Sequence, residues 1–424
     1  MLRRRALLRA LPATLLGLSA SRLARAEVTP STRKFMFVFA EGGWDTTWVF
    51  APEFDNAYVD MPTDDSQKVE QGGLTWVSST TRPSVDSFFT TWGSRTAIIN
   101  GVEIRSIAHE RCRRLLFTGG SDADVNDFPT RLAMGAPSHL PLGNVVFSGP
   151  AYADSTASSV VRVGQNGQLA ALLDGSCVSS GQGLRLPSSG VATLEEALVL
   201  ARAQRALGVA QAGAEARIVG AYASALEDAA GIADKVDLLR VSAEQPLEQL
   251  LAAATLLASG AARCVTVADQ GVDQITWDHH SEITRQSTCF EMLFGNLNTL
   301  IATLDATPGS AGGTLLDEIT IVVCSEMGRY PQLNSSFGKD HWTTTSMMLV
   351  GGGIRGGQTV GGHDENMGGI PVVPSTAELD PDGTAGGVVL QPIHIGATLL
   401  KLADLDVEEA FGPDIEPLTG VLDT

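Results

Sequence analysis

Residues 319–366 read ITIVVCSEMGRYPQLNSSFGKDHWTTTSMMLVGGGIRGGQTVGGHDEN, and this stretch says most about the fold. A β-branched run at 319–324 ends abruptly in Ser325-Glu326-Met327-Gly328-Arg329. Asp340 and His341 follow, just before a second apolar run at 346–350. Carboxylates and an imidazole at the exits of buried strands are the arrangement that metal-assisted hydrolysis uses.

Working outward, two more apolar runs predict buried strands, at residues 34–39 and 263–268, with a shorter strand at 96–101. Helices are expected at 109–117, 290–304 and 393–402, and an Ala- and Leu-rich section at about 190–260 predicts two to four more, broken near Gly213 and Pro246. Residues 51–84 are polar and predict a surface excursion, 120–188 predict loops and short strands, with 159–163 as the clearest strand, and 366–392 predict a long loop. Alternating strands and helices indicate an α/β fold, with a mostly parallel sheet and helices on both faces.

The first 26 residues predict a cleaved export signal. Arg3, Arg4 and Arg5 precede a short apolar segment, and Ala24-Arg25-Ala26 fits a cleavage site. Arg4 and Arg5 also fit the twin-arginine pattern, with an ordinary secretory signal as the alternative. The expectation is therefore a periplasmic or secreted protein that meets the twin-arginine machinery, with residues 27–424 as a single domain and no stable membrane span.

Charge limits the classes of partner. The chain has 29 Lys and Arg against 48 Asp and Glu, and removing the six arginines of the signal would take the net charge from −19 to −25. Such a surface repels nucleic acid and anionic membranes. An anionic ester, either small or polymeric, would need local positive charge from a metal or from an arginine such as Arg329. The five cysteines show no C-x-x-C spacing, which excludes a zinc ribbon.

Candidate metal ligands gather at the ends of the expected strands and helices. They are Asp45, His109, Asp278, His280, Glu326, Asp340 and His341. Carboxylate oxygen and imidazole nitrogen bind divalent metals, although zinc, calcium, magnesium and manganese are not distinguished by this set. Any one of these acids alone is more often a helix cap or a surface group, so the prediction of one or two metals depends on their joint placement.

The same segments resemble a known family, the bacterial domain-of-unknown-function family 1501, a distant branch of the alkaline phosphatase and sulfatase superfamily. The motifs that carry the resemblance are Glu41-Gly42-Gly43-Trp44-Asp45, Trp277-Asp278-His279-His280, Ser325-Glu326-Met327-Gly328-Arg329-Tyr330-Pro331 and Gly338-Lys339-Asp340-His341. The chain departs from the family pattern at Glu41, His279, Met327 and Tyr330. The resemblance implies an alkaline phosphatase-like three-layer sandwich and a metal-dependent hydrolase of phosphate or sulfate esters.

The resemblance also implies roles for individual residues. Asp45 would be the metal ligand after the first strand, Asp278 and His280 a second pair, and Glu326 a third acid. His341 would be a distal ligand, which Asp340 either joins or orients. Met327 stands where the superfamily often has a further histidine.

The nucleophile is the main departure. Residues 109–119 align with the sulfatase helix that carries the modified cysteine, but His109 stands at the nucleophile position. His109 could be phosphorylated or could bind a metal, and in the latter case a metal-activated water would attack. Cys112 lies one turn later, and Arg113 or Arg329 could hold the oxyanion.

Two functions therefore stay open on sequence alone. The first is an exported metal-dependent hydrolase of phosphate or sulfate esters. The second is a non-catalytic periplasmic binding or assembly protein that keeps the fold, which the missing Ser, Thr or Cys nucleophile favours. A third reading, a glycan binder, rests only on Trp44, Trp48 and Trp342.

Overall fold

The computed structural model describes residues 29, 32–154, 160–164, 168–173, 189–209, 213–242 and 244–423. Within these ranges one large sheet has eight strands, in the order β12-β4-β11-β8-β1-β7-β5-β6. They are β12 (Gln358–Val360), β4 (Thr96–Glu103), β11 (Thr344–Gly351), β8 (Ile319–Ser325), β1 (Lys34–Ala40), β7 (Ala262–Asp269), β5 (Gly143–Val146) and β6 (Val160–Arg162). Only β11 among them runs antiparallel to its neighbours, β4 and β8.

β1 shows why the central strands are apolar without interruption. Phe35, Phe37 and Phe39 pack into the core on one face of the sheet, while Met36 and Val38 pack into the core on the other. Successive side chains of a strand point to opposite faces, so a strand covered on both sides needs apolar residues at every position.

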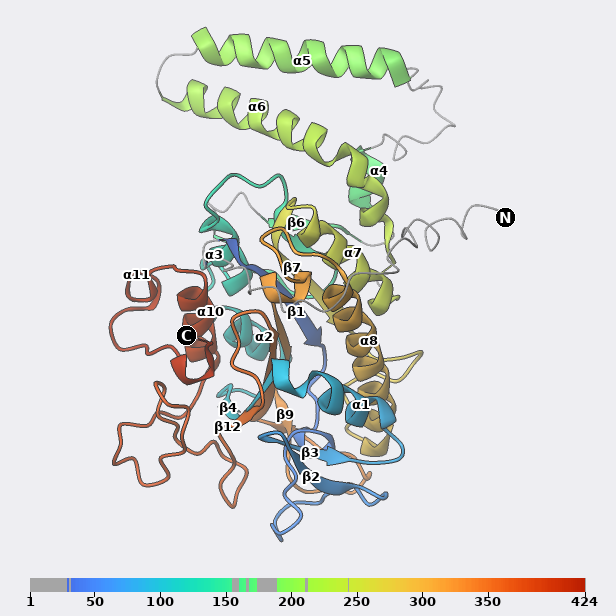
Figure 1. Ribbon diagram of the computed structural model, residues 1–424, viewed down its shortest axis with the longest axis vertical. Coiled ribbons are helices and arrows are strands. Elements are labelled where there is room, and N and C mark those ends of the chain that lie inside the picture. Colours follow the sequence, from blue (N-terminus) through green and yellow to red (C-terminus); the bar gives the residue numbers. More distant parts are fainter. Residues whose placement is uncertain are drawn as a thin grey trace.

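Helices cover both faces of this sheet (Figure 1). One core contains residues of α1 (Pro83–Trp92), α7 (Pro246–Ala258) and α8 (Gln286–Ala306). The other contains residues of α2 (His109–Thr118), α3 (Phe128–Met134) and α10 (Pro392–Leu402). The predicted fold class, a three-layer α/β sandwich with a mostly parallel sheet, is confirmed.

The predicted helical section contains α5 (Ser189–Val209) and α6 (Ala214–Ile232), followed by the 3-10 helix η7 (Ala233–Arg240) and then α7. Figure 1 shows α5 and α6 as a hairpin that stands away from the sheet. Gly213 directly precedes α6 and Pro246 is the first residue of α7, so both predicted breaks coincide with helix starts.

The remaining helices and strands of the described residues are short. They are β2 (Gln67–Gln71), β3 (Leu74–Ser78), β9 (Gly328–Arg329), β10 (His341–Trp342), α4 (Gln168–Leu173), α9 (Leu315–Glu318), α11 (Val407–Phe411) and the 3-10 helices η3 (Thr46–Trp48), η4 (Gly93–Arg95), η8 (Ile283–Arg285) and η9 (Thr419–Val421).

Three expectations differ from the structure. Residues 51–84 contain the β2–β3 hairpin and the start of α1, and Trp76 of the hairpin is buried. Residues 120–188 contain the expected short strands, β5 and β6, but also the helix α3, which was not expected. Trp44 and Trp48 are buried in the core, so they present no surface to a glycan.

The predicted export signal and Cys177 lie outside the described residues. Cys112, Cys264, Cys289 and Cys324 are buried free thiols. Across the described ranges, no helix has the length and apolar character that a bilayer crossing requires.

The topology brings the candidate residues to one edge of the sheet. The parallel strands β1, β7 and β8 end there, and they lead into Glu41, Gln270 and Glu326 respectively. β11 runs the opposite way, so its first residues, just after His341, lie at this same edge. The crevice outside the carboxyl ends of strands is where open α/β sheets bind ligands.

Candidate metal centre

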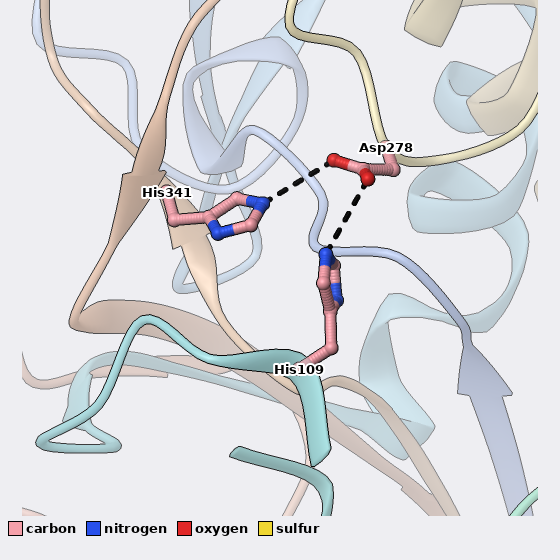
Figure 2. Close-up of side chains that lie close together, drawn as sticks. All are labelled: His109, Asp278 and His341. Carbon is pink, nitrogen blue, oxygen red and sulfur yellow. Dashed lines mark hydrogen bonds and ion pairs between the residues drawn. The ribbon is translucent and has the colours of Figure 1, made fainter. Parts of the chain in front are cut away.

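Three predicted ligands converge at this edge: His109, Asp278 and His341 (Figure 2). His109 is the first residue of α2, Asp278 lies in the loop after β7, and His341 begins β10. Nε2 of His341 lies 3.3 Å from Oδ1 of Asp278, and Nε2 of His109 lies 3.4 Å from Oδ2. One ligand atom from each residue fits within a span of 4.8 Å.

His280 joins the group from the solvent side. Its Nε2 lies 3.2 Å from Oδ1 of Asp278 and 3.0 Å from Nε2 of His341. The His280 side chain is 48% exposed, against 17% for His341, so the centre opens to solvent at His280.

The partners of the three imidazoles fix their tautomers. Nδ1 of His109 lies 2.9 Å from the carboxylate of Glu326, and Nδ1 of His280 lies 3.0 Å from that of Asp340. Nδ1 of His341 lies 2.7 Å from the backbone carbonyl of residue 107. All three partners only accept hydrogen bonds, so each Nδ1 carries the proton and donates it. In the neutral rings each Nε2 therefore carries a lone pair, and all three lone pairs face Asp278.

Such an arrangement requires positive charge between the groups. Two lone pairs at 3.0 Å, on His280 and His341, repel each other unless a proton or a cation lies between them. Nε2 of His109 is buried, and its contact with Oδ2 of Asp278 is long for a hydrogen bond, at 3.4 Å. The three Nε2 atoms lie 3.2–3.4 Å from the Asp278 oxygens, and the Nε2 atoms of His280 and His341 lie 3.0 Å apart. These separations compare with about 3.3–3.4 Å for the edge of a tetrahedron with metal–ligand bonds of about 2.0–2.1 Å. The residues present thus fit a divalent cation with nitrogen and oxygen ligands.

The pKa shifts agree with this electrostatic picture. Hydrogen bonds with Asp278 and then Glu326 raise the pKa of His109 to about 9. Burial alone would raise the pKa of Asp278, but the hydrogen bonds from His109 and Arg329 outweigh it and hold that pKa far below its usual range. Burial also opposes ionisation of Glu326, yet the hydrogen bonds from His109 and the Gly42 amide lower its pKa. Asp278 and Glu326 are therefore ionised, and His109 holds a proton that a bound cation would replace.

Glu326 and Asp340 were predicted as ligands, and the structure places both behind the histidines. Glu326 is fully buried and accepts from His109 and from the amide of Gly42, at 2.9 Å each. Asp340 is largely exposed and accepts from His280. Carboxylates that hold the far nitrogen of a metal-binding histidine orient the ring and raise its basicity.

Asp45 does not join this group. Its Oδ2 forms an ion pair of 2.8 Å with Nζ of Lys339, and both side chains are 1% exposed. Its Oδ1 accepts hydrogen bonds from the amide and the hydroxyl of Thr47, so Asp45 caps the N-terminus of η3. An ammonium thus takes the place beside Asp45 where the sequence predicted a metal.

Arg329 also differs from its predicted role as an anion binder. Its side chain is fully buried, and it donates to the carbonyls of Gly42, Gly43, Trp277 and Lys339. Its Nη2 also donates to Oδ1 of Asp278 at 2.7 Å. The guanidinium therefore ties the loops after β1, β7 and β8 together and positions Asp278.

Arg113 lies beside the centre, on the same face of α2 as His109. Its guanidinium contacts Glu41 at 3.1 Å, Glu110 at 3.0 Å and Glu326 at 3.5 Å. Three carboxylates therefore already neutralise the arginine that was expected to hold an oxyanion. Cys112 is fully buried, and burial raises the pKa of its thiol, so it is a packing residue and not a nucleophile.

Sequence reasoning missed two residues that shape the loop before His341. Lys339 was not singled out because no local pattern distinguishes a buried lysine from an exposed one. Gly338 allows the loop to touch His280, since a Cβ there would lie 2.1 Å from the carbonyl carbon of His280. The G-x-D-H spacing, already noted as a motif, was the available signal for Gly338.

Comparison with known proteins identifies the family. Residues 33–372 match the family model described as "Protein of unknown function (DUF1501)". This match covers most of the chain and confirms the resemblance drawn from the motifs. No curated protein sequence matches the chain.

Several solved structures are similar to the chain. A protein in the alkaline phosphatase superfamily from Vibrio parahaemolyticus has 9% identity and a TM-score of 0.38, covering 88% of this chain and 67% of that one. The lipooligosaccharide phosphoethanolamine transferase A from Neisseria meningitidis has 8% identity and a TM-score of 0.44, covering 92% and 58%. The lipoteichoic acid synthase LtaP from Listeria monocytogenes has 9% identity and a TM-score of 0.39, covering 96% and 78%.

Proposed function

We propose that this chain, which belongs to the DUF1501 family, is a metal-dependent hydrolase of phosphate or sulfate esters. One observation carries the proposal: three Nε2 atoms with fixed tautomers and the carboxylate of Asp278 converge on one point at a solvent-open edge of the sheet. His109, Asp278, His280 and His341 would hold the cation. The predicted signal at residues 1–26 makes the periplasm the proposed place of action.

A divalent cation in this set would supply Lewis acidity toward the ester oxygen and would lower the pKa of water. The chain's own residues supply orientation. Glu326 and Asp340 hold the Nδ1 protons of His109 and His280, and Arg329 holds Asp278. In the proposed reaction water adds its oxygen to phosphorus or sulfur, the bond to the ester oxygen breaks, and the alcohol leaves with a proton.

The arrangement favours direct attack by water over a covalent intermediate. Cys112, the thiol expected nearest to the centre, lies on α2 and is fully buried in the core. Nε2 of His109 points to Asp278, where it acts as a ligand in this proposal and not as a nucleophile. No phosphoryl or sulfuryl group should therefore be found on the protein during turnover.

The test is hydrolysis of 4-nitrophenyl phosphate and 4-nitrophenyl sulfate by the metal-loaded protein, with mass spectrometry of the protein quenched during turnover. We expect one of these esters to be cleaved, the activity to disappear with a chelator and to return with metal, and no phosphorylated or sulfated protein to accumulate. Asp278→Asn should fall to the background rate. His139→Ala, which changes an exposed histidine that contacts Asp228, should keep full activity.

Two results would contradict the proposal. A phosphorylated or sulfated protein found during turnover would show a covalent intermediate, with His109 as the first residue to examine. A metal-loaded, folded protein that cleaves neither ester would favour the alternative, a binding or assembly protein with a structural metal.

A further inference from the structure

A polar cavity adjoins the metal centre at the same edge of the sheet. Its volume is about 350 Å³, which lies in the range of small-molecule sites. Side chains that line it include Glu41, Glu110, Arg113, Tyr152, Arg162 and Gln270. They come from α2, from the end of β6 and from the segments that follow β1, β5 and β7.

Arg113 joins the cavity to the centre. It follows His109 by four residues on α2, so the two side chains share one face of the helix. Nε of Arg113 lies 3.5 Å from Oε1 of Glu326, and that oxygen is the one that contacts Nδ1 of His109. A substrate whose ester group lies at the histidines could therefore place its alcohol part in the cavity.

The charges of the lining are already balanced. Arg113 contacts both Glu41 and Glu110, and Arg162 donates to the carbonyls of residues 149 and 151. The charges of the two arginines and the two glutamates of the lining sum to zero. An anionic group would meet carboxylates here and a cationic group would meet guanidiniums, so the cavity favours neither.

Two polar atoms of the cavity, which lack a hydrogen-bond partner among the described residues, can pair with the hydroxyl groups of a ligand. The Tyr152 hydroxyl and Oε1 of Gln270 have no hydrogen-bond partner among the described residues, while Nε2 of Gln270 donates to Glu41 at 3.0 Å. Tyr152 is held in place by the Arg114 guanidinium, 4.5 Å from the centre of its ring. A hydroxyl group both donates and accepts, so it can pair with either kind of free atom.

We infer that this cavity binds the alcohol part of the substrate, and that this alcohol is neutral and carries several hydroxyl groups. The inference rests on the proposed function and narrows its substrate to monoesters of a polyol or sugar. Its recognition would come from hydrogen bonds and not from charge.

The test uses four three-carbon phosphonates that cannot be hydrolysed. They are propylphosphonate, 2,3-dihydroxypropylphosphonate, 3-aminopropylphosphonate and 3-phosphonopropionate, titrated into the metal-loaded protein by calorimetry. We expect the dihydroxy compound to bind about 3- to 10-fold tighter than propylphosphonate, the range for one net hydrogen bond. It should also bind tighter than the cationic and anionic compounds.

Two variants assign the effect to the cavity. Tyr152→Phe keeps the ring under Arg114 but lacks the hydroxyl, so the preference for the dihydroxy compound should fall by about threefold or more. Gln270→Leu should reduce it similarly. Tyr222→Phe removes an exposed hydroxyl on α6 and should leave the preference unchanged.

Four results would each overturn the inference. They are equal affinities for all four phosphonates, tighter binding of the cationic or anionic one, no binding of any phosphonate, and a dihydroxy preference that survives in both cavity variants. Failure of the proposed function is seen separately. In that case the dihydroxy preference and its loss in Tyr152→Phe persist, but glycerol phosphate is not hydrolysed.

Discussion

At the scale of the residue, the buried pair of Asp45 and Lys339 is the clearest departure from a two-metal site. Both groups are almost fully buried, so each needs the other. The pair also links the loop after β1 to the loop that carries His341. In this account the ammonium neutralises Asp45, and the described residues offer one metal centre.

Asp45→Asn should therefore cost stability and spare the metal. Leaving Lys339 buried without its partner should lower the free energy of unfolding by about 3–5 kcal/mol. The double variant Asp45→Asn with Lys339→Met should recover most of this loss. Urea unfolding of the two single variants and the double variant measures the coupling, and additive losses would show that the two groups are not coupled. An Asp45→Asn variant that stays stable but loses its metal would make Asp45 a ligand after all.

Glu326 and Asp340 make a matched pair, because each orients one histidine but only Glu326 is buried. Glu326→Gln would set an amide N–H against the Gly42 N–H or lose the contact with His109, so metal affinity should fall about 10- to 100-fold. Asp340→Asn can still accept from His280 in solvent, and its effect should be smaller. Competition with a chromogenic chelator measures both; a larger loss in Asp340→Asn would reverse the roles assigned here.

At the scale of the element, the end of β7 carries a second acid with an unusual pKa. Asp269 is 4% exposed, and burial raises its pKa to about 6 despite hydrogen bonds from the Gly271 amide and the Trp277 indole. These bonds tie the strand to the loop that leads to Asp278. Both reach the same oxygen, Oδ1, so an asparagine can keep them.

The sign of the pH effect follows from this raised pKa. Between pH 4 and 6 the folded state holds the Asp269 proton more tightly than the unfolded state, so this residue's contribution to stability declines as pH rises through that window. The contribution lost is about 3 kcal/mol. Asp269→Asn removes it, so the stability of the variant relative to the wild type should improve by about that amount from pH 4 to pH 7. Denaturant unfolding at the two pH values checks this, and a constant difference would mean that Asp269 titrates normally.

The elements that could be predicted are those whose sequences carry their own signal. β1, β7 and β8 are buried on both faces, so their runs are apolar throughout and were recognised. β5 has only four residues and depends on β6 and β7 for its pairing, and the β2–β3 hairpin is half exposed. Nothing in the local sequence distinguishes such elements from loops.

At the scale of the whole molecule, the edge at which the site forms could be predicted, but the individual contacts could not. Parallel strands bring their carboxyl ends together, so motifs at strand exits were expected to meet. Which acid binds a metal and which holds a histidine depends on a few ångströms between distant loops. The antiparallel β11, which returns His341 to this edge, and the Lys339 ammonium beside Asp45 both required the fold.

The most direct test of the central claim is metal content, measured by mass spectrometry on the mature protein purified without chelator. We predict about one divalent equivalent per chain, its loss in Asp278→Asn, and its retention in Asp45→Asn. A folded wild-type protein without metal, or an Asp278→Asn protein that keeps its full equivalent, would contradict the claim that His109, Asp278, His280 and His341 form a metal centre.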